Sequence, residues 1–383
     1  MKIVADDKIP FLRGVLEDTC KVEYYPGAAI TAEHVKDADA LIVRTRTKCN
    51  AGLLAGSSVK IVATATIGYD HLDTEWLDSA GIKWTNAPGC NSSSVAQYIT
   101  SILLNLAVKY NFELNGKTLG VIGVGNVGTK VAKCGEALGM KVLLNDPPRA
   151  EKEGNSAFVS LEELLAASDI VTVHVPLNRA GRFNTFHLAG DEFFGKMKAD
   201  AFFINSSRGE VCDNAVLKEV LNAKKIRGAT LDVWEGEPDI DLELLDLLEY
   251  GTPHIAGYSY DGKANGTAMS VQAVSRELGL DYLEWRPDNV PLPECTEIVL
   301  EDDEKLDKIL LNAINNSYDI SNDDRRLRNS PETFEKQRGD YPLRREFHLF
   351  DFTSEQKSPN ANTALEALRQ LRAVTAAFGA MKK

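Results

Sequence analysis

The sequence predicts an α/β fold with parallel sheets, and three observations support it. Short apolar runs alternate with polar, helix-like segments along most of the chain, which is typical of strands buried between two layers of helices. With 383 residues the chain is too long for one ordinary core, so two or three domains are expected. Its 44% of hydrophobic and 26% of charged residues are typical of a soluble globular protein.

The expected elements follow from apolar periodicity, taken in chain order. Near the start of the chain, buried strands are predicted at 2–6, 39–45 and 59–68. An apolar helix is predicted at 91–110, where serines offer N-caps. Further strands are predicted at 117–123, 141–146, 169–177, 201–207, 226–234 and 253–257, and helices at 160–168 and 267–285. The proline-rich stretch 287–293 is predicted to be a linker before a charged α/β segment.

The charge and the cysteine content limit which partners and which cellular compartment are expected. The net charge of −13 leaves no excess of basic residues, so neither nucleic acid nor an anionic membrane is an expected partner. The six cysteines form no CxxC pair and no metal-like spacing with histidine, so buried free thiols and no metal are expected. Neither a signal peptide nor a membrane span is indicated, and the predicted location is the cytoplasm.

A glycine-rich motif at 123–128, GVGNVG, lies directly after one predicted strand and at the start of a helix. Gly123 permits a tight turn, Gly125 lets the backbone approach a pyrophosphate, and Gly128 lets the helix pack closely on the strand. The N–H groups of Asn126 and Val127 are expected to face the phosphates. The motif in this context predicts a dinucleotide-binding site.

An acidic residue decides between the two nicotinamide cofactors. Asp146 ends the next predicted strand, 18 residues after Gly128, where a carboxylate is expected on the ribose hydroxyls. Because Asp146 would repel a 2′-phosphate, NAD is the predicted cofactor. Arg149 is close enough in sequence to leave NADP open.

Three further motifs fall at strand ends, where open α/β sheets bind ligands. They bring Arg208, the acidic residues of LDVWEGEP, and His254 to one edge; the acidic residues are Asp232, Glu235 and Glu237. Oxidation of a 2-hydroxy acid needs a cation for the carboxylate and a base for the hydroxyl proton. It also needs a carboxylate beside the imidazole. Arg208, His254 and Glu237 fit these three roles.

Each of these residues has a structural alternative. Arg208 alone could be a surface ion-pair partner, Glu237 could shape a turn, and His254 could be a packed imidazole at a strand end. Because the three arrive together beside a dinucleotide motif, we interpret them as an active site.

In their order, GVGNVG, NSSRGE, LDVWEGEP and TPHIAG resemble the D-isomer-specific 2-hydroxyacid dehydrogenases over about residues 1–285. The resemblance implies two flavodoxin-like, Rossmann-like doubly wound domains with the active site in the cleft between them. It assigns 1–93 and 257–285 to a substrate domain and 94–256 to an NAD-binding domain. It assigns 286–383 to a C-terminal α/β domain that forms a homodimer.

The same resemblance implies further contacts. Besides the glycine motif and Asp146, the residues implied to hold NAD are Val175, Ser206, Ser207, Arg208, Asp232 and Gly257. Those implied to touch substrate are Arg44, Thr45, Arg46, Thr66 and Tyr258. Arg44, Arg46 and Lys48 also suggest a phosphate on the substrate, although a solvated basic loop is the alternative.

The C-terminal segment resembles the tail of the family member that belongs to vitamin B6 synthesis. This implies oxidation of 4-phospho-D-erythronate at C2 to 2-oxo-3-hydroxy-4-phosphobutanoate. One alternative is 3-phosphoglycerate or another D-2-hydroxy acid as substrate. An alternative of another class is a corepressor-like protein that senses NAD(H).

Overall fold

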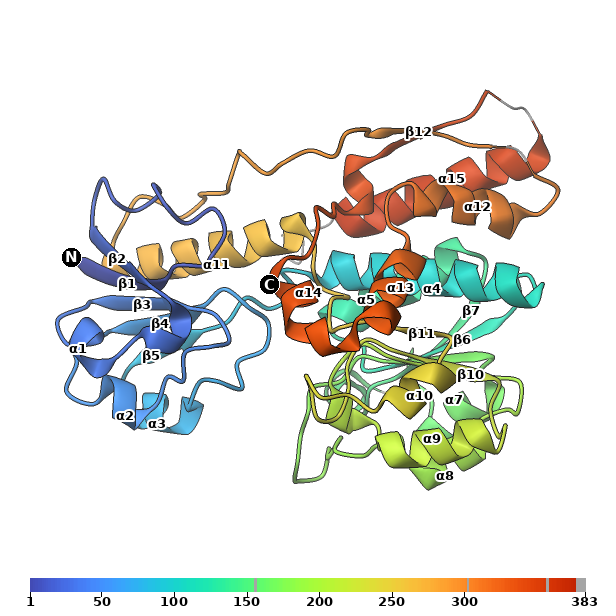
Figure 1. The fold of residues 1–383 in the computed structure, drawn as a ribbon, viewed down its shortest axis with the longest axis horizontal. Helices are drawn as coiled ribbons and strands as arrows, with labels where there is room; N and C mark the ends of the chain where they lie inside the picture. The colour runs from blue at the N-terminus through green and yellow to red at the C-terminus, as the bar shows by residue number, and fades with distance from the viewer. Residues whose placement is uncertain (155–156, 302, 356–357, 377–383) are drawn as a thin grey trace. The chain divides into compact units, whose positions relative to one another are not determined.

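The computed structural model describes residues 1–154, 157–301, 303–355 and 358–376 (Figure 1). The chain divides into two compact units, one of residues 1–91 with 259–292 and one of residues 92–258 with 293–383. The predicted domain boundaries, at 93/94 and 256/257, stay a prediction. Whether the C-terminal segment is a domain of its own stays a prediction.

The first unit is built on a five-stranded parallel sheet in the order β2-β1-β3-β4-β5. Its strands are β1 (Lys2–Asp6), β2 (Lys21–Tyr25), β3 (Ala40–Val43), β4 (Ile61–Thr64) and β5 (Lys83–Thr85). Its helices are α1 (Ala32–Val35), α2 (Ala51–Leu54), α3 (Thr74–Ser79) and α11 (Tyr260–Leu278). The two edge strands, β2 and β5, were not predicted, because their side chains are half-exposed and give no apolar run.

Helix α11 corrects the prediction of a helix at 267–285. Its N-cap is Ser259, whose side chain accepts the Gly262 N–H at 2.8 Å, and its C-cap is Gly279, which has φ +69°. Its first turns contain glycines, whose low helix propensity gives no helical signal in the sequence. Close packing requires them, because a Cβ at Gly266 would lie 2.5 Å from the Ala65 carbonyl oxygen. Tertiary packing therefore overrides local propensity here.

The second unit contains a six-stranded parallel sheet in the order β11-β10-β9-β8-β6-β7. Its strands are β6 (Thr118–Ile122), β7 (Lys141–Asn145), β8 (Ile170–Val173), β9 (Phe202–Asn205), β10 (Gly228–Leu231) and β11 (Tyr250–Gly251). The accompanying helices are α4 (Ser92–Tyr110), α5 (Asn126–Ala137), α6 (Pro147–Glu153), α7 (Leu161–Ala167), α8 (Asp191–Lys196), α9 (Asn214–Asn222) and α10 (Leu242–Leu247). The order reverses between β6 and β8, and open sheets bind their ligands at such a switch point.

The last strand of this sheet corrects another prediction. The strand is Tyr250–Gly251, whereas the predicted strand at 253–257 is a turn. The reason is the backbone of His254, whose φ of +57° cannot continue a strand. The other predicted strands and the helix at 91–110 are confirmed within a few residues.

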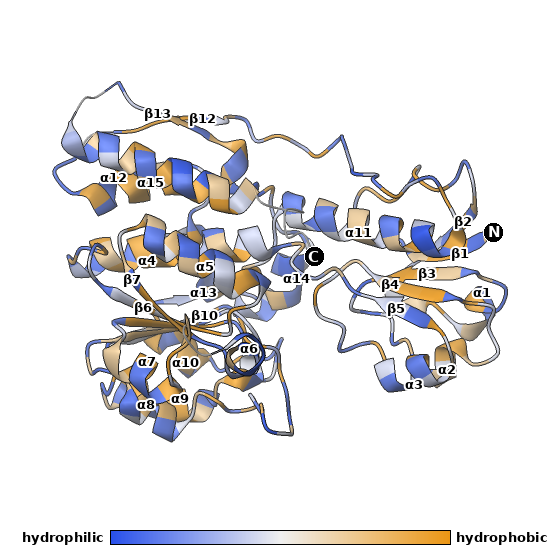
Figure 2. Ribbon diagram, turned by 180° about the vertical axis from the view of Figure 1, so that it is seen from behind, coloured by the Kyte–Doolittle hydropathy of each residue, from blue (hydrophilic) through white to orange (hydrophobic). Residues whose placement is uncertain are grey.

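The core of the second unit lies around the sheet and α4. Every residue from Ser92 to Ala107 is buried, and β8, β9 and β10 are buried throughout. Figure 2 shows hydrophobic residues gathered along the strands of each sheet. Such strands give continuous apolar runs, which explains why they were recognisable in the sequence.

The C-terminal segment adds helices and a small sheet to the second unit. Strands β12 (Glu297–Val299) and β13 (Asp351–Thr353) pair in parallel. Its helices are α12 (Leu306–Asn315), α13 (Ile320–Asn329), α14 (Phe334–Gly339) and α15 (Pro359–Ala376). Helices α12 and α15 form a layer over α4 and α5 (Figure 1), whereas α13 packs against β11.

Two smaller predictions concern cysteines and membranes. Five of the six cysteines are buried, but Cys295 is exposed, so the expectation of six buried thiols was wrong at that position. The exposed cysteine follows the proline-rich stretch, where no core covers it. Within the described ranges, no helix combines the length and apolarity that a membrane span needs.

Candidate active site

The glycine motif forms the turn between β6 and α5. Gly123 has φ +83°, and a Cβ there would lie 2.6 Å from the His174 carbonyl oxygen. A Cβ at Gly128 would lie 2.0 Å from the Gly123 carbonyl oxygen. At Gly125, by contrast, a Cβ would meet no described atom within 4 Å. The turn therefore needs two glycines for its own packing, and the third leaves room in front of the helix for a pyrophosphate.

The start of α5 faces the same open space. Asn126 and Val127 are its first two residues, and backbone N–H groups at that position have no partner within a helix. These donors suit phosphate oxygens.

Asp146 connects the next strand to this turn. Its carboxylate accepts the Val124 N–H at 2.8 Å and the Arg149 N–H at 3.0 Å, and it caps α6. The Arg149 guanidinium binds both oxygens of Glu153, at 2.8 and 2.7 Å, and the Val124 carbonyl oxygen. The Arg149 guanidinium is therefore paired with Glu153 and not left for a 2′-phosphate, which favours NAD over NADP.

The residues predicted to line the nicotinamide lie after β8 and β9. Val175 is half-buried just beyond β8. The Ser207 hydroxyl and N–H both donate to Asn205 Oδ1, at 2.8 and 3.0 Å. The Ser206 hydroxyl is buried and has no hydrogen-bond partner in the described parts of the chain. A buried hydroxyl without a partner is costly unless a ligand satisfies it, so these residues fit a bound cofactor.

The central pair is His254 and Glu237, which come from the turns after β11 and β10. His254 Nδ1 and Glu237 Oε2 are 2.8 Å apart, and Glu237 Oε1 accepts the Trp234 N–H at 2.9 Å. Burial raises the pKa of Glu237, but the hydrogen bond and charge of His254 outweigh it and lower that pKa overall. Because Glu237 is thus ionised, Nδ1 of His254 must donate, which leaves Nε2 able to accept a proton.

The strained backbone of His254 is held by Asp232. The His254 N–H donates to the Asp232 carbonyl oxygen at 2.7 Å. The buried carboxylate of Asp232 accepts the N–H groups of Ile255 and Ala256, at 2.7 and 2.9 Å, and the Thr252 hydroxyl at 2.6 Å. Burial raises the pKa of Asp232 despite these donors. The sequence analysis placed Asp232 beside the nicotinamide. It missed that Asp232 also bonds to the backbone of His254 and of the two residues that follow it.

Arg208 lies in the turn after β9, the strand next to β10. Its Nη1 donates to the Ser207 carbonyl oxygen at 2.8 Å, and its side chain is half-buried. The next residue, Gly209, packs so tightly on the following motif that a Cβ would lie 2.0 Å from the Trp234 carbonyl oxygen. The three predicted catalytic residues thus lie on adjacent turns at one edge of the sheet.

The other glutamate of the motif has a different partner. Glu235 Oε1 is 2.7 Å from His187 Nε2, and Glu235 Oε2 accepts the Asn214 N–H at 2.9 Å. This arrangement ties α9 to the turn and leaves Glu237 as the partner of His254.

The substrate residues predicted in the first unit follow β3 and β4. Arg44 donates to the Lys8 carbonyl oxygen at 3.2 Å, and Thr45 and Arg46 are exposed. The Thr66 hydroxyl donates to the Gly68 carbonyl oxygen at 2.9 Å, so its proton is engaged within its own loop. That these residues meet the His254 pair across a cleft stays a prediction.

A further cation of this unit was missed. Lys263, on α11, has its pKa lowered by burial first and then by the charge of Arg44. Two neighbouring cations favour an anionic ligand. Nothing in the sequence signals this proximity, because the two residues are more than two hundred positions apart.

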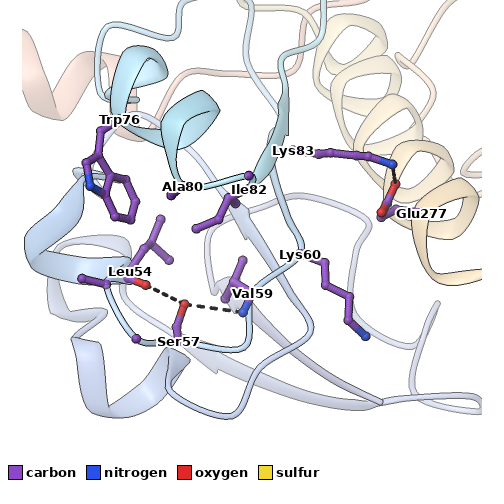
Figure 3. Close-up of a pocket in the computed structure, with 12 residues that line it drawn as sticks. Leu54, Ser57, Val59, Lys60, Trp76, Ala80, Ile82, Lys83 and Glu277 are labelled. Carbon is purple, nitrogen blue, oxygen red and sulfur yellow. Dashed lines mark hydrogen bonds and ion pairs between the residues drawn. The ribbon is translucent and has the colours of Figure 1, made fainter.

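A pocket of about 340 Å³ in the first unit lies at the wrong edge for this chemistry (Figure 3). It is lined around Leu54, Lys60 and Trp76, and the Lys83 ammonium at its rim pairs with Glu277 at 2.6 Å. Lys60 and Lys83 lie at the amino ends of β4 and β5, whereas parallel sheets bind ligands at the carboxyl ends.

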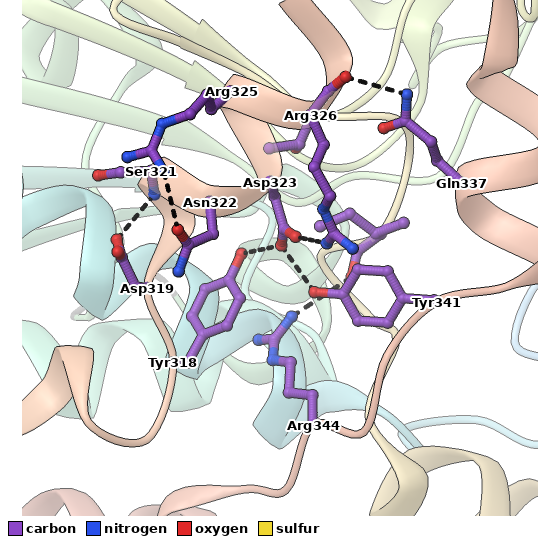
Figure 4. Close-up of polar contacts among 12 residues, drawn as sticks. Tyr318, Asp319, Ser321, Asn322, Asp323, Arg325, Arg326, Gln337, Tyr341 and Arg344 are labelled. Carbon is purple, nitrogen blue, oxygen red and sulfur yellow. Dashed lines mark hydrogen bonds and ion pairs between the residues drawn. The ribbon is translucent and has the colours of Figure 1, made fainter. Parts of the chain in front are cut away.

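The C-terminal segment reaches the His254 turn through residues that sequence reasoning did not assign. Arg344 is buried and donates to the Ser94 and Ala256 carbonyl oxygens, at 2.6 and 3.3 Å. Its guanidinium lies 3.7 Å from the ring centroid of Tyr318. Figure 4 shows the Tyr318 and Tyr341 hydroxyls converging on Asp323 beside it, at 2.9 and 2.6 Å.

Comparisons with known proteins identify the family of this chain. Residues 104–256 match the D-isomer specific 2-hydroxyacid dehydrogenase, NAD binding domain, and residues 290–371 match a domain of unknown function (DUF3410). An erythronate-4-phosphate dehydrogenase of Bacteroides thetaiotaomicron is 51% identical over 90% of this chain and 97% of its own. An erythronate-4-phosphate dehydrogenase of Proteus mirabilis is 42% identical over 91% of this chain and 93% of its own.

A solved structure has a similar fold. A D-lactate dehydrogenase from Aquifex aeolicus, complexed with NAD and lactic acid, is 29% identical with a TM-score of 0.59. It covers 72% of this chain and 95% of its own. These similarities identify an enzyme that uses NAD, which sets aside the corepressor alternative. The chain belongs to the erythronate-4-phosphate dehydrogenases, within the NAD-dependent, D-isomer-specific 2-hydroxyacid dehydrogenase family.

Proposed function

We propose that this enzyme oxidises 4-phospho-D-erythronate at C2 to 2-oxo-3-hydroxy-4-phosphobutanoate, a step toward pyridoxal phosphate. The observation that carries the proposal is the 2.8 Å contact between His254 and Glu237, at the same carboxyl edge of the sheet as the glycine turn, in a chain 51% identical to an erythronate-4-phosphate dehydrogenase. The two carboxyl-end turns supply a base and its carboxylate partner, as oxidation of a hydroxyl requires.

Each residue of the trio has one task in this proposal. Bound NAD supplies the acceptor for the hydride that leaves C2. His254 Nε2 takes the hydroxyl proton, and the Glu237 carboxylate stabilises the imidazolium that forms. Arg208 binds the substrate carboxylate through its forked guanidinium and polarises the C2 oxygen. The alcohol thus loses a hydride from C2 and a proton from its hydroxyl to become a ketone.

The remaining residues would hold the substrate. Arg44 and Arg46, with Lys263 nearby, supply positive charge for the 4-phosphate. Thr45, Thr66 and Tyr258 carry hydroxyls that can bond to the substrate oxygens. Tyr258 belongs to the second unit and the other residues of this set to the first. That they bind one substrate together is part of the proposal.

Initial rates of NADH formation test the proposal. We expect a much higher kcat/KM with 4-phospho-D-erythronate than with 3-phosphoglycerate, and His254→Gln should remove most turnover while NADH still binds. A preference for 3-phosphoglycerate would overturn the substrate, and wild-type turnover by the His254 variant would overturn the base.

We also propose that the enzyme is a cytoplasmic homodimer joined through its C-terminal segment. The five buried cysteines, which form no disulfide among the described residues, suit a reducing compartment. The β12–β13 sheet has only two strands, and Val299 is 55% exposed on it. Two-stranded sheets are marginal alone, so a partner would stabilise this one. Sedimentation of the wild type and Val299→Glu tests this: we expect a dimer that the substitution weakens.

A further inference from the structure

Arg338, on α14 in the C-terminal segment, lies beside a predicted substrate residue. Its guanidinium carbon is 5.9 Å from the ring centroid of Tyr258, four residues after the His254 base. Nη1 donates to Glu335 Oε1 at 3.0 Å, and the side chain is 21% exposed. Its Nε is buried and bonds to no acceptor in the part of the chain that the structure describes. A buried N–H that lacks an acceptor is costly unless a ligand supplies one.

The surroundings keep this guanidinium in place and charged. Tyr258 is held on another side by Tyr341, whose ring lies edge-on at 5.8 Å and whose hydroxyl donates to Asp323. Burial lowers the pKa of Arg338, but the nearby Tyr258, Glu237, Glu335 and Asp232 raise it overall. Glu237 is therefore close enough to sense the charge of Arg338, which places that charge in the neighbourhood of the catalytic pair.

We propose that Arg338 binds the phosphate of the substrate, so that the C-terminal segment contributes to specificity as well as to assembly. The inference rests on the proposed function, because it assumes a phosphorylated hydroxy acid. A phosphate oxygen would accept the unpaired Nε–H and complete a charge-assisted pair.

The phosphate is a better match for Arg338 than the carboxylate is. The carboxylate already has Arg208. The D-lactate dehydrogenase structure is matched over 95% of its own length yet covers 72% of this chain, so more than a quarter of this chain has no counterpart there. Lactate carries a carboxylate and a hydroxyl but no phosphate.

Substitution of Arg338 should change substrate preference more than it changes the fold. We expect Arg338→Met to raise KM for 4-phospho-D-erythronate by roughly 10- to 100-fold, as loss of a hydrogen bond to a charged group predicts. The ratio of kcat/KM for that substrate to kcat/KM for unphosphorylated D-erythronate should fall at least about tenfold. Arg338→Lys should recover part of the ratio, because it restores the charge without the fork.

A matched control is Arg325→Met, since Arg325 is exposed on α13 of the same segment. It should leave the ratio unchanged. Melting temperature and NADH affinity of all variants identify any that fail to fold. If Arg338→Met lowers kcat/KM equally for both substrates, Arg338 does not read the phosphate and the proposal is overturned.

Binding of inorganic phosphate separates this inference from the proposed function. With NADH saturating, phosphate should protect the wild type against thermal unfolding. In Arg338→Met, the same protection should require at least about ten times as much phosphate. Equal protection of both proteins, or none of either, would overturn the inference. Failure of the wild type to oxidise 4-phospho-D-erythronate would instead overturn the proposed function, and the phosphate comparison would still decide the role of Arg338.

Discussion

Two glutamates only two positions apart have different partners. Glu237 binds His254, whereas Glu235 binds His187 and the start of α9. The cause is the turn itself, which directs one oxygen of Glu237 onto the Trp234 N–H and the other onto the imidazole. The sequence analysis assigned Glu237 to the imidazole, and the observed hydrogen bond is the one that this predicted role requires.

This difference predicts unequal effects of two matched substitutions. In Glu237→Gln, the amide oxygen can still accept from Trp234, so the amide nitrogen must face His254 Nδ1. The imidazole would then carry its proton on Nε2 and could not act as a base, and kcat should fall roughly 10²- to 10⁴-fold. Steady-state rates measure this, with NAD binding followed by fluorescence.

Glu235→Gln is the control, because it alters the His187 contact and leaves the catalytic pair intact. It should retain most of its turnover. Equal losses in the two variants would mean that the turn, and not the charge of Glu237, limits activity.

Among the elements, the β6–α5 turn separates folding from binding within one motif. A Cβ at Gly123 would collide with the His174 backbone and one at Gly128 with the Gly123 carbonyl, whereas a Cβ at Gly125 would meet no described atom within 4 Å. The same six-residue pattern thus contains two glycines that the fold requires and one that the ligand requires.

Two alanine substitutions should reveal this division. Gly128→Ala should lower stability by about 1–3 kcal/mol through overpacking, which lowers the melting temperature by several degrees. Gly125→Ala should leave the apoprotein melting temperature near that of the wild type but reduce the stabilisation by NAD, which is about 2.7 kcal/mol at 100 times Kd for an intact site. Differential scanning fluorimetry with and without NAD measures both, and unchanged NAD stabilisation in Gly125→Ala would contradict the assignment.

For the whole molecule, the C-terminal segment is part of the same compact unit as the sheet that carries the trio. Arg344 provides the link, because its buried guanidinium bonds to Gln97, to Ser94 at the start of α4, and to the carbonyls just after His254. The segment therefore supports the geometry of the His254 turn in addition to any role in dimerisation.

Removing this link should loosen two distant stretches together. Arg344→Met would leave several buried acceptors without a donor, so we expect a loss of about 2–4 kcal/mol in the free energy of unfolding. Hydrogen exchange should increase in α4 and at 250–258, with little change at 1–91. Arg369→Met, at a side chain 70% exposed on α15, is the control. Uniform exchange changes across both units would contradict the link.

The sequence by itself determined the parallel α/β class, most strands, the NAD motif and the order of the trio. These features are local: buried strands need continuous apolar runs, and a pyrophosphate turn needs glycines at fixed spacing. Edge strands such as β2 and the glycine-rich start of α11 escaped prediction, because half-exposed side chains and low propensity give no local signal.

Only the tertiary structure decided how the site is held. The left-handed backbone of His254, the clamp by Asp232, and the approach of Arg338 and Arg344 all depend on contacts between residues far apart in the chain. Their stabilisation comes from burial and hydrogen bonds between residues that only the folded unit brings together. No local pattern encodes such contacts, since the energy that selects them belongs to the packed unit and not to either stretch alone.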